Sequence, residues 1–524
     1  MKNKNFIFFI VLIVFLIFLK SDFRIINNLQ CCNDDFDYYA HASTIAEDFD
    51  FDYSNQLPDK SRYYRNNKNA PFGFVGTGLL SSPFILLGNI VDNLSKFEGN
   101  TQLSFKKLFY SFSSIFYFLL SLLLIRKIQQ FYKVKFNYLL YFLGSGISYY
   151  VFERFSMTPI YEVFTILCLI YLTQQFINNP LNRKLYSFLI PLSLLLSILV
   201  RWTNLYVFLI PIIVLLSYKG FKPDLFKKLF NIYFFVSSVL SFLIFIFLSK
   251  QIYGVLTFSP SYVYMVDEFD TLISDSILKN FFNFILEFLK DFIVINFSQE
   301  FGLFWFSPII FISIFLIIYR IIFYKNSKNF LLYFFLLISF LQNFFIVSIW
   351  NSTASSYGYR YLFSLIPLSF LVIFINNELL NKKLTLGYLK YFSIFAFIST
   401  LFFDSTQFTT LSLEPVLNSF GYEKVYSQPK YLEGVVKSIF EFEAYKKIIA
   451  TSFLFLFIIE LFINQFKIEL LYKYVFEISI QNSDLSDLLY KIDELSVTYF
   501  IMTLIIALIF SIQILKHLRV ENKS

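Results

Sequence analysis

The sequence predicts an all-α, polytopic membrane protein with about 11 to 13 transmembrane helices. Hydrophobic residues make up 57% of the 524 residues and charged residues only 15%, whereas about a quarter of a soluble domain is charged. Apolar runs of about 17 to 20 residues recur along the chain, and each could cross a hydrocarbon core of about 30 Å as a helix. Helices are expected because a lipid-exposed backbone must satisfy its own hydrogen bonds.

The orientation is predicted by lysines and arginines, which cluster in alternate short loops as they do on the cytoplasmic side of membrane proteins. These residues are Lys2, Lys4, Arg126, Lys127, Lys133, Lys135, Arg183, Lys184, Lys219, Lys222, Lys227, Lys228, Arg320, Lys325, Lys328, Lys382 and Lys383. If all of them face the cytoplasm, the loops between them face outward.

This orientation decides how the apolar segment 71–91 is interpreted. A crossing there would place Arg126 and Lys135 outside and invert every later loop. We therefore expect residues 71–91 to lie in the outer interface, or to dip into the membrane and return. Its glycine-rich start, FGFVGTGLL, and Pro83 favour a broken helix.

The remaining apolar runs define the predicted spans. They are 5–20, 106–125, 137–152, 160–177, 185–200, 203–218, 229–249, 302–320, 329–348, 361–376, 385–403, 448–465 and 497–515. Residues 1–403 would form the membrane core, with 21–105 as its first outward loop and 404–447 as a later one. Residues 448–524 would add the last spans around a small cytoplasmic segment, 466–496. This count places Lys516, Arg519 and Lys523 outside, against the positive-inside rule. The sequence therefore leaves the number and orientation of the last two spans open.

The first span begins the chain. Residues 6 to 19 resemble the apolar part of a signal peptide, but no small-residue cleavage site follows, so we expect an uncleaved span. Cys31, Cys32 and Cys168 form no disulfide framework. We interpret the CC pair as two ordinary small residues rather than a strained vicinal bridge.

An acidic stretch, NDDFDYYAHASTIAEDFDFDY, follows this span at residues 33–53. Its centre, Phe36 to Ala46, predicts a short helix on which Asp37 and His41 share one face. Apolar residues lie on another face, which predicts an amphipathic helix on the membrane surface presenting its carboxylates to a cavity. Two alternatives stay open: a solvated acidic loop, and a metal site whose spacing matches no standard cage. The metal site would use Asp34, Asp35, Asp37 and His41.

A second acidic feature is ERFSMTPIYEVF, residues 153–164. Glu162 falls just inside a predicted span, and an intramembrane carboxylate predicts a functional site. The alternative is that Glu162 pairs with Arg154 or Arg201 and only holds helices together.

Two arginines fall at the outer ends of predicted spans. Arg201, in SILVRWTNLYVF, either extends its head group to the interface or meets an anion. Arg360, in IWNSTASSYGYRYLFSLIP, is surrounded by aromatic residues including Tyr359. A planar guanidinium in this setting suits a phosphate. A fifth feature, QEFGLFWFSPIIF, opens a span at residues 299–311 with a glycine and a proline.

In this order, the five features resemble those of the GT-C superfamily of polytopic glycosyltransferases, which includes protein O-mannosyltransferases and lipid A aminoarabinose transferases. DDFDYY is similar to the paired acidic motif after the first span, and APFGFVGTGLLSSPFILLG to the helix that follows it. MTPIYE is similar to a second acidic site. GLFWFSP and WNSTASSYGYRYL are similar to two further segments of bacterial members. The resemblance covers about residues 5 to 375. The tryptophan-to-arginine loop lacks the double glycine of many relatives, and a long C-terminal soluble domain is absent.

The resemblance implies a fold, an activity and roles. The chain would move a sugar from a polyprenyl-phosphate donor to a glycan, lipid or protein hydroxyl at the outer membrane face, with inversion. Asp34 would be the general base, and Asp35 would orient it or hold the acceptor. Glu162 would contact the sugar or acceptor, and Arg360, then Arg201, would bind the phosphate. Asp37, His41 and Tyr359 would add substrate contacts.

Further expectations concern partners and location. We expect no cofactor, a divalent cation not being indicated, and no nucleic-acid partner. The protein would be a multi-pass protein of a bacterial inner or plasma membrane, with its site on the periplasmic or exterior side. The competing hypotheses are a transporter or flippase for lipid-linked sugars, and a scaffold that binds polyprenyl phosphate without catalysis. Transporters often carry internal repeats with broken helices, and the sequence shows no such repeat.

Overall fold

The computed structural model describes the helical core of the chain. It covers residues 34–57, 64–95, 104–134, 138–152, 154–218, 223–260, 277–298, 301–323, 327–350, 358–377 and 383–402, with Val436 and Phe440. The predicted spans 5–20, 448–465 and 497–515 and the segment 466–496 lie outside these residues. So do Cys31, Cys32 and nearly all of the loop 404–447.

The all-α polytopic class is confirmed. Among the described residues, five helices are long and apolar enough to cross a membrane. They are α6 (Phe105–Tyr132), α9 (Pro159–Asn178), Pro180–Val200, which comprises η2 (Pro180–Asn182) and α10 (Arg183–Val200), α13 (Ile232–Tyr253), and Asn329–Ser348 within α19 (Ser327–Trp350). Shorter apolar helices are α18 (Pro308–Phe323), η3 with α11 (Leu205–Leu209, Ile210–Ser217), and η4 with α20 (Arg360–Leu365, Ile366–Ile375).

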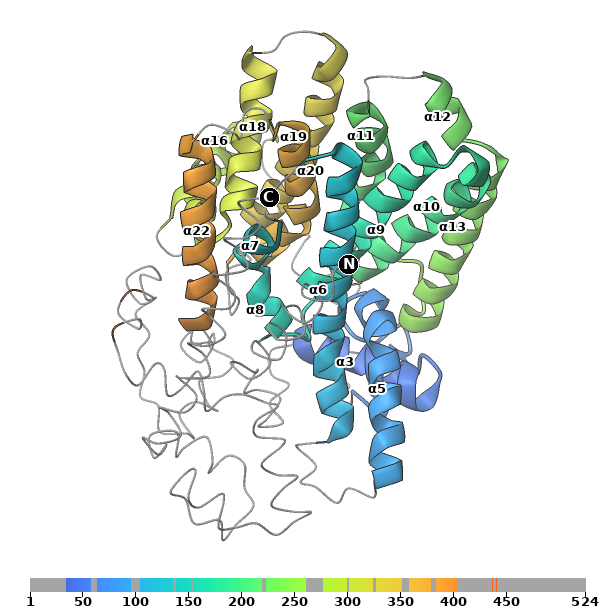
Figure 1. Cartoon of the computed structure of the whole chain (residues 1–524). Coiled ribbons are helices and arrows are strands. Elements are labelled where there is room, and N and C mark those ends of the chain that lie inside the picture. Colours follow the sequence, from blue (N-terminus) through green and yellow to red (C-terminus); the bar gives the residue numbers. More distant parts are fainter. Residues whose placement is uncertain are drawn as a thin grey trace.

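Figure 1 shows these helices as two groups with α6 between them. One group contains α9, α10, α11, α12 (Pro223–Leu229) and α13. The other contains α16 (Ile277–Phe297), α18, α19, α20 and α22 (Lys383–Phe402). The two helices that precede α6, α3 (Asp34–Ser43) and α5 (Gly76–Ser95), lie below the first group, beside the N-terminal half of α6.

Prolines mark the beginnings of several helices in this bundle. Pro159, Pro211, Pro308 and Pro367 each occupy the first turn of a helix, where a missing backbone N–H costs nothing. A short element precedes three of these helices: η3 precedes α11, α17 (Leu303–Phe306) precedes α18, and η4 precedes α20. The predicted spans 203–218, 302–320 and 361–376 are therefore not continuous α-helices, and their ends carry irregular backbone close to the arginines.

The predicted span 137–152 is wrong as a single helix. It forms α7 (Tyr138–Leu143) and α8 (Ile147–Phe152), separated at Gly144–Ser145–Gly146. Gly146 has a φ of 84°, which favours glycine. A Cβ on Gly144 would lie 2.2 Å from the backbone oxygen of Ser393 on α22, so only glycine permits this approach. After the break, α8 ends two residues before Arg154.

The predicted break in segment 71–91 is also wrong. α5 is one continuous helix with Pro83 inside it. Its first residue packs against the end of α10, since a Cβ on Gly76 would lie 2.3 Å from the backbone nitrogen of Val200. Gly88 packs as closely on the start of α6, where a Cβ would lie 2.5 Å from the Cα of Lys106. Helix α5 therefore runs away from the end of α10 along α6.

A small hairpin, which was not predicted from the sequence, lies between α3 and α5. β1 (Tyr64–Arg65) and β2 (Lys68–Asn69) pair antiparallel. The turn residues Asn66 and Asn67 both have positive φ, as a two-residue hairpin turn requires. The hairpin contacts the C-terminal end of α13 at Gly254.

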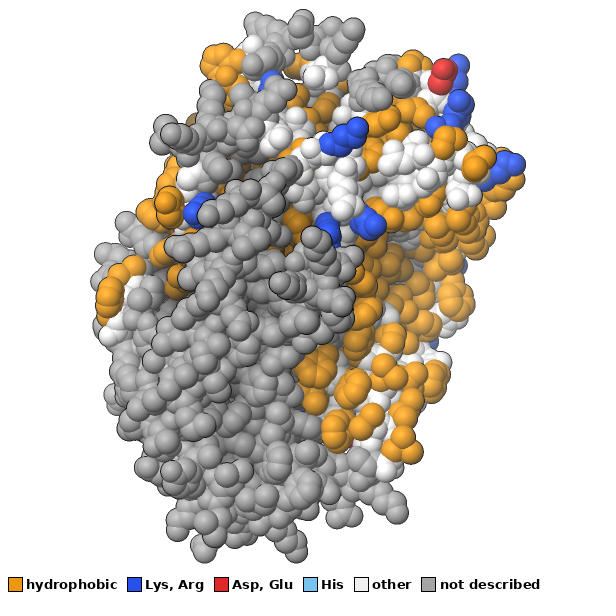
Figure 2. All heavy atoms as spheres, viewed as in Figure 1, with side chains coloured by type: hydrophobic (Ala, Val, Ile, Leu, Met, Phe, Trp, Pro, Cys, Tyr) orange, Lys and Arg blue, Asp and Glu red, His pale blue; other side chains and the backbone are white. Residues whose placement is uncertain are grey.

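The surface separates into apolar and basic regions. In Figure 2 the face seen carries a broad apolar surface, with Lys and Arg side chains gathered towards the end where α12 lies. Lys227 and Lys228 in the last turn of α12 and Lys133 after α6 lie in this part of the chain. On α13, Ile232, Phe235, Val239 and Leu243 are each more than half exposed, as expected of a helix that contacts lipid.

Candidate active site

Helix α3 is buried, so the predicted amphipathic surface helix is wrong. A helix does form, beginning at Asp34, but Asp35, Asp37, Tyr38, His41 and Ala42 are all buried. The helix packs against α5 and continues as the π-helix η1 (Thr44–Asp48). The carboxylates of Asp35 and Asp37 therefore point into the protein.

Asp37 and His41 hold α3 in place. The backbone N–H of Phe72 donates to Asp37 Oδ2 at 3.1 Å. His41 Nε2 lies 2.8 Å from the carbonyl oxygen of Gly73, and its Nδ1 lies 2.6 Å from the hydroxyl of Tyr53. Burial lowers the pKa of His41 to about 4, although the hydrogen bond to Gly73 acts in the opposite direction. With 1% and 0% exposure, Asp37 and His41 present no surface to a substrate, contrary to our expectation of substrate contacts.

Asp35 pairs with Arg154, which precedes α9. The Arg154 Nη2 and Nε donate to Asp35 Oδ2 at 2.8 and 3.0 Å, and the Ser156 hydroxyl donates to Asp35 Oδ1 at 2.5 Å. Arg154 and Asp35 are 1% and 6% exposed. Asp35 thus fixes α3 to the start of α9, and these contacts give it a structural role rather than the expected one of orienting Asp34.

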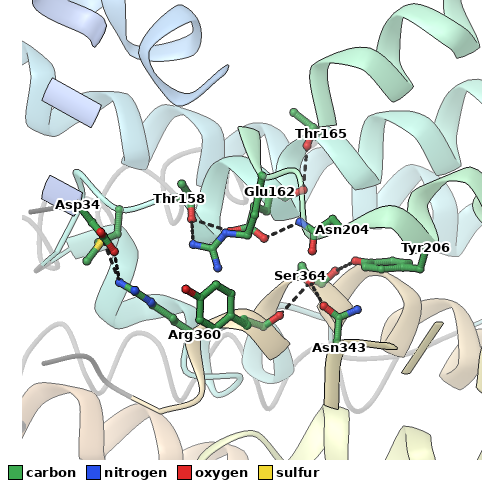
Figure 3. Close-up of polar contacts among 12 residues, drawn as sticks. Asp34, Thr158, Glu162, Thr165, Asn204, Tyr206, Asn343, Arg360 and Ser364 are labelled. Carbon is green, nitrogen blue, oxygen red and sulfur yellow. Dashed lines mark hydrogen bonds and ion pairs between the residues drawn. The ribbon is translucent and has the colours of Figure 1, made fainter. Parts of the chain in front are cut away.

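Glu162 pairs with Arg201, one of the two alternatives left open by the sequence. The Arg201 Nε lies 3.0 Å from Glu162 Oε1, which also accepts from the Thr158 hydroxyl at 2.6 Å. Asn204 Nδ2 donates to Glu162 Oε2 at 2.7 Å. Thr158 also accepts from Arg201 Nη2. Figure 3 shows this network between the first turn of α9 and the segment after α10. Glu162 is completely buried and both its oxygens are engaged.

Asp34 pairs with Arg360 at the beginning of η4. The Arg360 Nη1 lies 2.6 Å from Asp34 Oδ2 and 3.8 Å from the sulfur of Met157. The Arg360 side chain is 15% exposed and the Asp34 side chain 35% exposed, which makes this pair the most accessible of the three. Asp34 is therefore the one predicted catalytic acid with a partly open carboxylate.

Tyr361 joins two of the pairs. The Arg201 Cζ lies 4.4 Å from the centre of the Tyr361 ring, and the Arg360 Cζ lies 5.2 Å from it. Both contacts are cation–π distances. Arg201 Nη1 and Arg360 Nε are buried, and neither has a hydrogen-bond partner among the described residues. Two guanidinium groups with unused donors thus share one aromatic ring.

Three carboxylates and three guanidinium groups therefore converge, which balances the buried charge. Partial burial raises the pKa of Asp34. The charges of Arg360, Arg154 and Arg201, together with the Arg360 hydrogen bond, outweigh this effect and hold the pKa below its ordinary value. Asp34 is accordingly ionised at neutral pH.

Tyr359 directly precedes Arg360. Its ring packs edge-on against Phe301, 6.5 Å between centres, and its side chain is nearly buried. The sequence analysis named Arg154 only as a partner of Glu162, and missed Thr158, Asn204 and the shared role of Tyr361. Their signals were the polar residues in MTPIYE and RWTN and the second tyrosine of GYRY.

The metal alternative finds no support in the arrangement of α3. Asp34, Asp35, Asp37 and His41 turn to different partners. Across the described parts of the chain, no three His, Cys, Asp or Glu side chains come together as metal ligands would.

Comparison of the sequence with models of known families, with curated proteins and with solved structures gave no match.

Proposed function

We propose that this chain is a GT-C type glycosyltransferase that uses a polyprenyl-phosphate sugar as donor. The observation that carries the proposal is the position of Asp34. It is the most exposed of the three paired acids, and it lies against Arg360 and its neighbour Arg201 at one end of the helical bundle. A base and a phosphate-binding cation thus lie side by side.

The proposed reaction assigns one task to each group. The donor phosphate binds at Arg360 and at the unused Nη1 of Arg201. The acceptor hydroxyl gives its proton to Asp34 and its oxygen bonds to the anomeric carbon. The bond from that carbon to the phosphate oxygen breaks, and the electron pair stays on the phosphate. The arginines stabilise the charge that develops there, and attack from the opposite side inverts the anomeric carbon.

The buried acids have supporting tasks in this proposal. Glu162 and Thr158 hold the Arg201 guanidinium over Tyr361. Asp35 holds the segment that carries Met157 and Thr158 through Arg154 and Ser156. The acceptor in this proposal is a glycan, lipid or protein hydroxyl. An outward-facing site in a bacterial inner or plasma membrane is part of the same proposal.

The test is a transfer assay in membranes that contain the protein. Labelled polyprenyl-phosphate sugars are supplied, and a new labelled glycoside is sought. Asp34→Asn should abolish transfer while the protein remains expressed and inserted, because the amide cannot accept the proton. Near-normal transfer by Asp34→Asn would remove Asp34 from the role of base.

A second variant tests the phosphate assignment. Arg360→Ala should raise the donor concentration needed for half-maximal rate far more than the acceptor concentration, because of the two substrates Arg360 binds only the donor, through its phosphate. An effect confined to the acceptor would contradict the assignment. Asp50→Asn is the matched control for Asp34→Asn, because Asp50 is an exposed aspartate that follows the same helix, α3.

A second candidate function is transport of a lipid-linked sugar, and one feature favours it. The break between α7 and α8 gives a discontinuous helix of the kind that transporters use at their binding sites. The same assay separates the two functions: a transporter moves the labelled lipid across the membrane without forming a new glycoside.

A further inference from the structure

The proposed base and the proposed phosphate-binding arginine are bonded to each other. Arg360 Nη1 lies 2.6 Å from Asp34 Oδ2. An arginine that already holds a carboxylate can bind an anion at that nitrogen only after the carboxylate leaves. A carboxylate held by arginine is likewise a weaker base than a released one. The protein without substrate therefore has both groups occupied.

This pair is built differently from the other two. Asp35 accepts from two nitrogens of Arg154 and from Ser156, and Glu162 accepts from Arg201, Asn204 and Thr158. Asp34 has Arg360 as its one partner among the described side chains. It is also 35% exposed, whereas Asp35 and Glu162 are at most 6% exposed. Water can solvate Asp34 on release, so this pair opens at the lowest cost.

Arg360 has contacts that would keep it in place after Asp34 leaves. Its guanidinium lies over the Tyr361 ring and against the sulfur of Met157. Its Nε is buried without a partner among the described residues, so a second donor is available to an incoming anion. The arginine is therefore a fixed element and the aspartate a displaceable one.

We propose that the Asp34–Arg360 ion pair is a latch, which a lipid-linked phosphate opens by taking the place of Asp34 on Arg360. This inference rests on the proposed function, because it uses that donor class. Donor binding then precedes activation of the acceptor: Asp34 becomes a free base only beside a bound phosphate. Asp34 returns to Arg360 when the product phosphate leaves.

Binding of a short-chain isoprenyl phosphate, which carries no sugar, tests the latch without any chemistry. The full chain is placed in lipid nanodiscs and titrated by calorimetry. Asp34→Asn should bind this phosphate about three- to tenfold more tightly than the wild type, because no carboxylate competes for Arg360. Asp50→Asn, on the exposed part of the same loop, should bind like the wild type.

The double variant makes the test specific. In an Arg360→Gln background, Asp34→Asn should leave the affinity unchanged, because the contested nitrogen is gone. An equal gain in both backgrounds would mean a general effect of removing negative charge and would overturn the latch. So would unchanged affinity in the single variant, or no binding of the phosphate by any form.

The two proposals can fail separately. If sugar transfer occurs but the binding cycle shows no coupling, the latch is wrong and the glycosyltransferase proposal stands. If the cycle shows coupling but no sugar is transferred, the latch stands as a binding device and the glycosyltransferase proposal is wrong.

Discussion

At the scale of single residues, the three paired acids differ most in burial. Glu162 is completely buried with both oxygens engaged, Asp35 is nearly so, and Asp34 is partly open with one partner. Removing one member of a buried ion pair leaves an uncompensated charge inside the protein. Loss of a member of a partly exposed pair costs less, because water can reach the charge that remains. Burial therefore separates acids that support the fold from the acid that is available for chemistry.

This difference in burial predicts how much each acid contributes to the stability of the fold. Asp35→Ala and Glu162→Ala should each lower the unfolding free energy by about 3–5 kcal/mol, whereas Asp34→Ala should lower it by no more than about 1 kcal/mol. The thermal denaturation midpoint of the purified protein in detergent measures the ranking. A loss of stability for Asp34→Ala as large as that for Glu162→Ala would contradict it.

His41 predicts a pH dependence of stability. Its pKa of about 4 in the folded protein lies below the unfolded value of 6.5, so between these values the unfolded chain binds more protons. Stability should be full above pH 6.5 and fall as the pH drops towards 4, by at most about 3 kcal/mol from this residue. The measurement is the denaturation midpoint from pH 7.5 to pH 5. His41→Gln should flatten that slope, and an unchanged slope would show that His41 does not titrate on unfolding.

At the scale of elements, the position of α5 depends on glycines that allow backbone contact. Gly76, at the start of α5, packs against Val200, the last residue of α10. The next residue along the chain is Arg201, which belongs to the candidate site. A methyl group there would collide with the backbone of Leu199 and Val200, which cannot move aside as a flexible side chain could.

The corresponding prediction compares two helical glycines. Gly76→Ala should lower stability by about 1–3 kcal/mol and reduce sugar transfer, because α5 must shift from α10 next to Arg201. Gly387→Ala on α22 is the control, since nothing lies within 4 Å of a Cβ there. The control should be neutral or stabilising, because alanine favours helix more than glycine. Equal destabilisation by both substitutions would mean that helix geometry, rather than the contact with α10, is responsible.

At the scale of the whole molecule, the acid–arginine pairs lie at one end of the bundle. Helix α9 connects this end, at Glu162, with the basic segment at Arg183 and Lys184. Its 20 residues extend about 30 Å, the thickness of a hydrocarbon core. The positive-inside rule then predicts that α3 and the loop around Leu181 lie on opposite sides of a membrane.

Labelling of single cysteines measures this topology. Phe49, 75% exposed after η1, and Leu181, 96% exposed before α10, are replaced by cysteine in a variant without native cysteines. The cells are first treated so that the reagent reaches an intact inner or plasma membrane. A membrane-impermeant maleimide should then label position 49, and should label position 181 only after that membrane is permeabilised. Labelling of both positions from the same side would contradict the proposed orientation.

The sequence by itself determined the all-α polytopic class, most helix positions, and which segments carry acids and arginines. Long apolar runs, prolines at helix starts and charges at helix ends are local properties, and each can be recognised along a single helix. Only the tertiary structure decided that Asp34 pairs with Arg360, Asp35 with Arg154 and Glu162 with Arg201. It also decided that α3 is buried and that the helix breaks at Gly144–Gly146 where α22 approaches. These outcomes depend on which helices lie side by side. The arrangement of the helices is set by packing between side chains that are distant in sequence. The periodicity of residues along one helix does not encode that packing.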